Sequence, residues 1–157
     1  MTLERIKGEL SSYYVGALIC SVITGILFLA TDFAGWYNYS PRIYGWVGSY
    51  ALYEGGAIGG LAFVFIGLAF LGIAALSFIA LRHPEKIPSI KILQGSMVFS
   101  GVIAILSIIG AIVFEVEMAD ADYTDWWLGE AFYGGLIGGL LTAALLYLAI
   151  KGFETKK

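Results

Sequence analysis

The chain has 157 residues, of which 59% are apolar and 13% charged, and its net charge is −3. Soluble domains carry about 25% charged residues, so this composition excludes an ordinary water-soluble domain. The mean hydropathy of +0.84 favours the lipid bilayer as the main partner of the chain, and the acidic balance gives no basis for nucleic-acid binding.

Four uncharged stretches predict four transmembrane helices, at about 10–31, 55–81, 92–114 and 131–150. A bilayer core about 30 Å thick needs about 20 helical residues, and these runs are continuous, whereas barrel strands alternate. The predicted fold class is an all-α integral membrane protein, a four-transmembrane-helix bundle that forms one transmembrane domain over residues 1–157. No A-x-A-like cleavage site follows the first run, so we expect a signal anchor there.

The positive charges predict the topology. Eight Lys and Arg residues flank one side of the predicted helices, and Arg42 alone lies on the other side. The positive-inside rule therefore predicts a cell-membrane protein with both termini and the loop 82–91 in the cytoplasm. The segments 32–54 and 115–130 become the outer loops.

A glycine-rich string at 55–60 recurs 79 residues later, at 134–139. The same offset relates small residues spaced four apart on helix 1 to those on helix 3: Ala17, Ser21 and Gly25 to Ser96, Ser100 and Ala104. Two helices per unit keep the same orientation, so we expect two tandem hairpins in a parallel pseudo-repeat about the membrane normal.

The two strings contain overlapping GxxxG pairs, formed by Gly55, Gly56, Gly59, Gly60, Gly134, Gly135, Gly138 and Gly139. Small residues let helix backbones approach closely in lipid. Packing within the bundle, a homo-oligomer interface and a pore or lipid slot are all open interpretations. We expect Leu at Gly59 or Gly138 to destabilise the fold, because overpacking costs about 1–3 kcal/mol.

Aromatic residues gather in the first outer loop, which has two Trp and five Tyr. Such a segment either folds over its own bundle as a lid or contacts a partner. Pro41 and three glycines break it into turns, which favours a short hairpin or a re-entrant helix. The residues of the predicted partner surface are Trp36, Tyr37, Tyr39, Tyr44 and Trp46.

Acidic residues suggest two further sites. In the second outer loop, Asp120, Asp122 and Asp125 could surround a hard cation, or they form a solvated acidic loop. Glu54 and Glu130 precede helices 2 and 4, where they form an acidic vestibule or interact with helix dipoles.

No catalytic motif is present in the sequence. His83 is the only histidine, and Cys20, the only cysteine, is interpreted as a small packing residue. Asn38 begins a glycosylation sequon that Pro41 follows directly. We expect no cofactor and no enzymatic activity.

Four spans, internal termini and a long aromatic first outer loop resemble claudin-like tetraspan proteins in outline. The resemblance covers the topology and the region from Trp36 to Trp46; the cysteine pair and the Gly-Leu-Trp motif of that family are absent. The predicted function is a non-enzymatic structural or accessory subunit that acts through glycine-mediated packing and the aromatic loop. Two alternatives stay open: a small cation channel or transporter with an acidic vestibule, and a lipid-binding or lipid-processing protein with a groove between helices 2 and 4.

Overall fold

The structure is a computed structural model, and it describes residues 3–52, 57–83, 89–121 and 123–154. The long helices are α1 (Leu3–Ala30), α2 (Ala57–Arg82) and α3 (Ile90–Asp120). The last helix has three parts: α4 (Glu130–Tyr133), the π-helical segment η3 (Gly134–Gly138) and α5 (Gly139–Glu154). The strands are β1 (Asp32–Tyr39), β2 (Arg42–Gly48) and β3 (Asp125–Leu128), and a 3-10 turn, η1 (Ser49–Leu52), follows β2.

The prediction of four membrane-length helices is confirmed. Each of the four apolar helices is long enough to cross a membrane, and in an 18-residue apolar window of each only 28–39% of the residues are buried inside the chain. Most of their apolar surface is therefore left for contact with lipid, as expected when lipid replaces water as the solvent.

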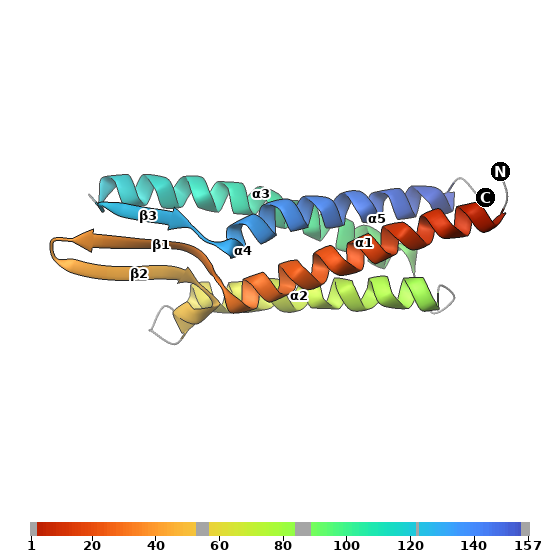
Figure 1. The fold of residues 1–157 in the computed structure, drawn as a ribbon, viewed down its shortest axis with the longest axis horizontal. Coiled ribbons are helices and arrows are strands. Elements are labelled where there is room, and N and C mark those ends of the chain that lie inside the picture. The colour runs from red at the N-terminus through yellow and green to blue at the C-terminus, as the bar shows by residue number, and fades with distance from the viewer. Residues whose placement is uncertain (1–2, 53–56, 84–88, 122, 155–157) are drawn as a thin grey trace.

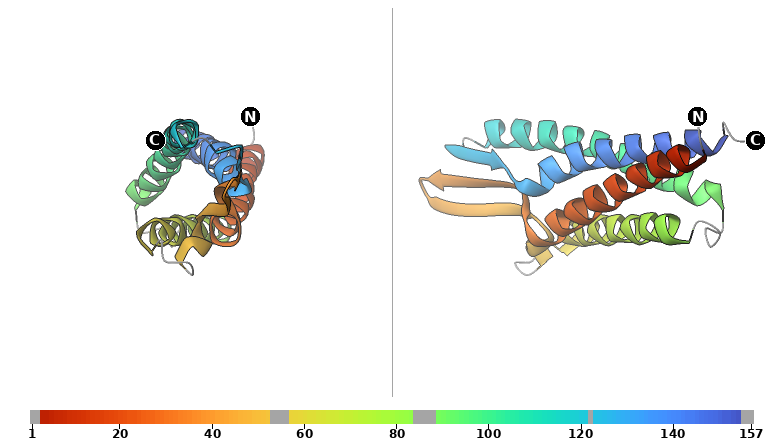
Figure 2. Two further views of the ribbon diagram at one scale, coloured as in Figure 1. Left: turned by 90° about the vertical axis from the view of Figure 1, so that its left-hand side faces the viewer. Right: turned by 45° about the vertical axis from the view of Figure 1, so that its right-hand side comes forward.

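The helices pack in the order α2, α1, α5, α3 (Figure 1; Figure 2). Contacts are extensive between α1 and α2, between α1 and α5, and between α3 and α5, whereas α2 and α3 hardly touch. A twofold relation between the two hairpins would make the α1–α5 and α2–α3 contacts equivalent. Here they are unequal, so the bundle is open between α2 and α3.

Small residues form the closest helix crossings. Between α1 and α2, a Cβ on Gly25 would lie 3.0 Å from the Gly67 carbonyl oxygen. Between α3 and α5, a Cβ on Gly139 would lie 2.8 Å from the Ser100 carbonyl oxygen. The repeat relates Gly139 to Gly60, seven residues before Gly67, so the two crossings lie at different depths along their hairpins.

The helix α3 continues beyond residue 114, where the hydropathy pattern predicted its end. It therefore includes Glu115, Glu117 and Asp120, which the sequence assigned to a loop. The cause is tertiary, because Phe114 and Met118 on this extension are buried. Trp36 of β1 and Trp126 of β3 lie against Phe114, with ring centroids 6.0 and 6.1 Å away.

An antiparallel sheet of order β2-β1-β3 projects from the end of the bundle opposite the chain termini (Figure 1). Strand alternation gives it two faces. The α3 face carries Ala34, Trp36, Trp126 and Leu128, whereas the open face carries Tyr37, Tyr39, Tyr44, Trp46 and Trp127. The first loop is thus a hairpin, one of the two predicted forms, and a strand from the second loop joins it.

Phenylalanine rings form a column inside the bundle. Phe28 of α1 lies between Phe63 and Phe70 of α2, at centroid distances of 5.9 and 6.3 Å. At the sheet end Phe33 continues the column, 5.4 Å from Phe63, and at the other end Phe99 of α3 lies 5.8 Å from Phe70. The contact between Phe70 and Phe99 is where α3 approaches α2, and space is left on both sides of it.

Candidate functional site

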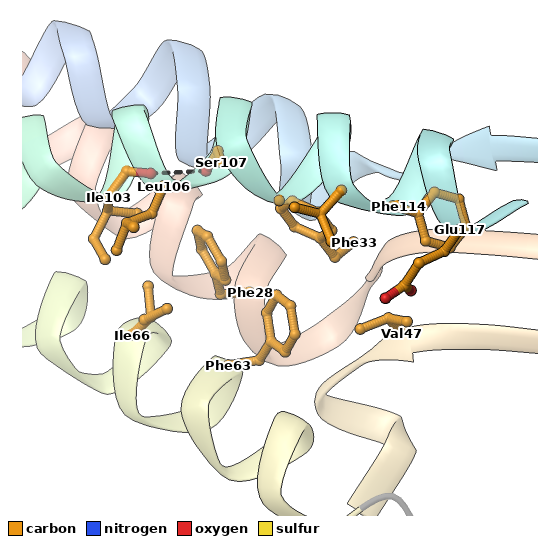
Figure 3. A pocket seen from close by; sticks show the side chains of 12 residues that line it. Phe28, Phe33, Val47, Phe63, Ile66, Ile103, Leu106, Ser107, Phe114 and Glu117 are labelled. Carbon is orange, nitrogen blue, oxygen red and sulfur yellow. Dashed lines mark hydrogen bonds between the residues drawn. The ribbon is translucent and has the colours of Figure 1, made fainter.

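A cavity of about 360 Å³ lies between α2 and α3 at the sheet end (Figure 3), and we call it the α2–α3 cavity. It is lined by Phe28, Phe33, Val47, Phe63, Ile66, Ile103, Leu106, Ser107, Gly110, Val113, Phe114 and Glu117. The column supplies one wall and α3 the other, so the cavity extends from within the bundle to the underside of the sheet. Its volume is within the range of small-ligand sites.

The wall of this cavity is apolar in practice. The hydroxyl of Ser107 donates to the Ile103 carbonyl oxygen at 2.9 Å, so its proton is used within α3. Gly110 keeps space open, because a Cβ there would meet the Phe33 ring at 3.2 Å. An apolar chain is therefore the ligand part that this wall can solvate.

Of the described residues that line the α2–α3 cavity, Glu117 is the one ionisable residue. It is exposed, and Figure 3 shows its carboxylate directed toward Val47 at the sheet side of the cavity. A negative charge there disfavours an anionic group and favours a hydroxyl or a cation.

A second cavity, of about 470 Å³, continues along the same side of the bundle, beyond Phe70 and Phe99. Ala69, Gly72, Ile73, Leu76, Gly95, Ser96 and Phe99 line it. Among the described residues α1 lies between α2 and α5, so these two helices do not form the groove expected between helices 2 and 4 (Figure 2). The open groove is between α2 and α3.

The two glycine strings have different surroundings. In the second string Gly134 faces Leu27, Gly135 faces Ser107 and Phe28, Gly138 faces Thr24, and Gly139 faces α3. In the first string a Cβ on Gly59 would have no neighbour within 4 Å and Gly60 is buried, while Gly55 and Gly56 lie outside the described residues. The second string thus packs against Phe28 and Ser107, two residues that line the α2–α3 cavity.

The small residues spaced four apart on α1 and on α3 are all buried: Ala17, Ser21, Gly25, Ser96, Ser100 and Ala104. Three of the hydroxyl groups here, and Thr142, have partners on the helices. Ser21 and Thr142 lie 3.5 Å apart, and Thr24 donates to the Gly134 carbonyl oxygen at 3.3 Å. Ser100 donates to the Ser96 carbonyl oxygen at 2.9 Å. Cys20 is a half-buried free thiol on α1.

The cation site proposed at Asp120, Asp122 and Asp125 stays a prediction. Asp120 ends α3 and Asp125 begins β3, while Asp122 lies outside the described residues. The Asp125 carboxylate accepts a hydrogen bond from the Tyr39 side chain, and this bond raises the pKa of Tyr39. Within the described ranges no group of three His, Cys, Asp or Glu side chains could hold a metal ion.

The predicted partner surface is divided between the two faces of the sheet. Tyr37, Tyr39, Tyr44 and Trp46 lie on the open face, whereas Trp36 lies on the α3 face between Phe114 and Tyr123. At the hairpin turn the Asn38 side-chain oxygen accepts a hydrogen bond from the Ser40 backbone N–H, at 2.9 Å.

The structure brings Glu130 close to Asp32, and Glu54, its predicted partner, lies outside the described residues. Sequence reasoning missed this acidic pair. A signal was present, because Asp32 follows the first apolar run and Glu130 precedes the last, and antiparallel helices bring such ends together. The α2–α3 cavity has no comparable signal, since it depends on which helices pack.

Comparison of the chain with protein-family models, with curated proteins and with solved structures finds no match.

Proposed function

We propose that the protein is a non-enzymatic membrane protein that holds the apolar chain of a membrane amphiphile in the α2–α3 cavity. In this proposal the sheet end lies outside the cell and both termini are cytoplasmic, as the distribution of Lys and Arg suggests. The observation that carries it is the apolar cavity left where α2 and α3 fail to pack.

The surroundings support an acyl or isoprenoid chain as the occupant. The part of the cavity farthest from the sheet is lined by the membrane-length helices, whose natural solvent is hydrocarbon. The part of the cavity nearest the sheet is covered by the sheet, so a bound chain would be partly shielded there from the surrounding lipids. Because of Glu117 at the mouth, the polar end is a hydroxyl or a cation rather than a phosphate.

A photoactivatable alkyl alcohol tests the proposal. Leu106→Trp fills the cavity from a side chain that is 52% exposed, and Ile105→Trp, at a site 58% exposed that does not line the cavity, is the matched control. Labelling of α3 around residues 103–113 should fall several-fold in Leu106→Trp only. Equal labelling of both variants would contradict a ligand in this cavity.

A second candidate, the structural or accessory role, rests on the open face of the sheet. Tyr39 and Tyr44 there are 62% and 56% exposed, although they lie outside the apolar spans. Exposed aromatic clusters of this kind are typical of interfaces. We propose a twofold contact between the open faces of two copies as its form.

Cysteine crosslinking tests this second function. In a Cys20→Ala background, Tyr39→Cys should give a disulfide-linked dimer in membranes. Ala119→Cys, an exposed position on α3 at the same end, should not. Absence of a dimer with Tyr39→Cys under oxidising conditions would contradict pairing through the open face.

A further inference from the structure

A separate cavity lies where the sheet meets the helices, and we call it the sheet–helix cavity. Its volume is about 820 Å³, and Ala30, Thr31, Asp32, Tyr44, Trp46, Tyr50 and Glu130 line it. It is on the opposite side of β2 from the α2–α3 cavity, because Trp46 lines one and the next residue, Val47, lines the other.

The backbone places two carboxylates side by side in this cavity. Asp32, the first residue of β1, and Glu130, the first residue of α4, both line it, and they are close enough for the charge of Glu130 to act on Asp32. Between them the Gly129 N–H donates to the Phe33 carbonyl oxygen at 2.8 Å. A Cβ on Gly129 would overlap the Asp32 carbonyl oxygen, so this close approach requires glycine.

The chain supplies little positive charge near this pair. Over residues 31–81 and 92–150 the sequence has one cationic side chain, Arg42. Arg42 begins β2, and Gly48 at the other end of β2 pairs with Asp32. Six residues of strand separate Arg42 from Gly48, a distance of about 20 Å. Burial, and then the charge of Glu130, raises the pKa of Asp32.

Aromatic side chains complete the wall of the sheet–helix cavity. Tyr44 and Trp46 have ring centroids 5.5 Å apart with planes inclined by 55°, and Tyr50 lies on the third side. The indole Nε1 of Trp46 is buried and has no hydrogen-bond partner in the part of the chain that the structure describes.

We propose that the sheet–helix cavity binds a quaternary ammonium group, with Tyr44, Trp46 and Tyr50 around the methyl groups and Asp32 and Glu130 as counterions. Aromatic rings attract such weakly hydrated cations through their faces. A hard cation such as Ca²⁺ needs six to eight oxygen ligands, and two carboxylates cannot supply them. The proposal is independent of the α2–α3 cavity and of its ligand.

Titration of the full chain in maltoside detergent tests the proposal, with choline and tetramethylammonium chloride as probes and tryptophan fluorescence as readout. Sodium chloride at equal ionic strength corrects for screening. Binding should be saturable and should weaken about ten- to thirtyfold in Trp46→Leu, since a partly to fully desolvated cation–π contact contributes about that factor. Trp46→Phe keeps a ring and should retain much of the affinity; calorimetry replaces fluorescence for both variants.

Asp32→Asn with Glu130→Gln should abolish this binding, whereas Asp125→Asn, which removes a carboxylate from the same sheet outside the cavity, should not. Melting temperatures verify that each variant is folded. Binding of tetramethylammonium no greater than that of Na⁺, binding that the double variant retains, or tighter binding of Ca²⁺ that the double variant abolishes would each overturn the proposal.

The source of the ammonium group is decided by nanodiscs. If phosphatidylcholine nanodiscs prevent choline binding that phosphatidylglycerol nanodiscs allow, the ligand is a lipid headgroup. If both allow it, the ligand is a free quaternary amine. Either result supports the site.

Discussion

Gly59 and Gly138 occupy the same position in the two glycine strings, yet they have opposite surroundings. Gly59 has open space around it, whereas a Cβ on Gly138 would overlap the Thr24 hydroxyl oxygen. The sequence motif is the same in both places, so the requirement for glycine comes from the neighbouring helix and not from the motif.

Gly138→Leu should therefore destabilise the protein by about 1–3 kcal/mol, because the larger side chain forces α1 and the η3–α5 helix apart. Gly59→Leu is the matched control and should be neutral or slightly stabilising, since Leu has the higher helix propensity. Melting temperatures in detergent measure both changes. Similar losses in the two variants would show that Gly59 also lies at a close contact, as the sequence analysis expected.

Asp32 gives the stability a predictable dependence on pH. Its pKa is raised above the ordinary value of 3.8 in the fold, first by burial and then by Glu130. Its contribution to stability is therefore fully present below that ordinary value and is lost as the pH rises through the raised pKa. Asp32→Asn should raise the melting temperature at pH 7.5 relative to wild type more than at pH 4. Parallel pH profiles for the two proteins would contradict this.

The sheet depends on glycines that lie opposite tryptophans. Gly35 of β1 pairs with Trp127 of β3, and Gly45 of β2 pairs with Trp36 of β1. A Cβ on either glycine would overlap the paired indole ring. Each indole thus lies over a glycine of the neighbouring strand. The Trp36 ring packs toward α3 on one face of the sheet, and the Trp127 ring lies on the open face.

A double-mutant cycle tests this pairing. Gly35→Ala should destabilise the protein by about 1–3 kcal/mol, because its methyl group displaces the Trp127 ring. The same change should cost much less in a Trp127→Ala background, giving a coupling energy of about 0.5–3 kcal/mol. Chemical denaturation followed by near-ultraviolet circular dichroism measures it. Additive effects would mean that the ring does not lie over Gly35.

At the scale of the whole molecule, several hydroxyl groups inside the bundle have partners on its helices, whereas the buried Ser77 hydroxyl has none among the described residues. Ser100 and Ser107 donate to carbonyl oxygens four residues earlier, Thr24 donates to Gly134, and Ser21 lies beside Thr142. Hydroxyls used in this way do not provide a hydrated path, and the two cavities between α2 and α3 are lined mostly by apolar side chains.

Purified protein in liposomes should accordingly show no cation flux above that of empty vesicles, measured with Na⁺, K⁺, Ca²⁺ and proton indicators. Glu54→Gln combined with Glu130→Gln should change neither flux nor folding appreciably, since both residues flank the apolar runs. Reproducible flux that this double change abolishes would favour the channel interpretation instead. The control is the same protein with Glu115→Gln, an exposed carboxylate on α3.

Much of the membrane part was predictable because hydrocarbon imposes simple rules. Four long apolar runs had to form helices, since each must satisfy its backbone hydrogen bonds internally, and their approximate limits followed from where charge begins. The continuation of α3 to Asp120 could not be predicted from hydropathy, because it depends on the burial of Phe114 and Met118, and Trp36 and Trp126 from distant strands lie against Phe114. The twofold relation between the hairpins stays a prediction.

The sequence by itself determined the number of apolar helices and the places where glycine allows close packing, because these depend on local composition. Only the tertiary structure decided which glycines are in contact, which helices stay apart and which carboxylates meet. The physical reason is that an apolar residue favours lipid and protein neighbours almost equally in a membrane, so hydropathy does not specify partners. The shapes of the packed side chains specify these partners. In this chain they leave α2 and α3 apart and bring Asp32 beside Glu130.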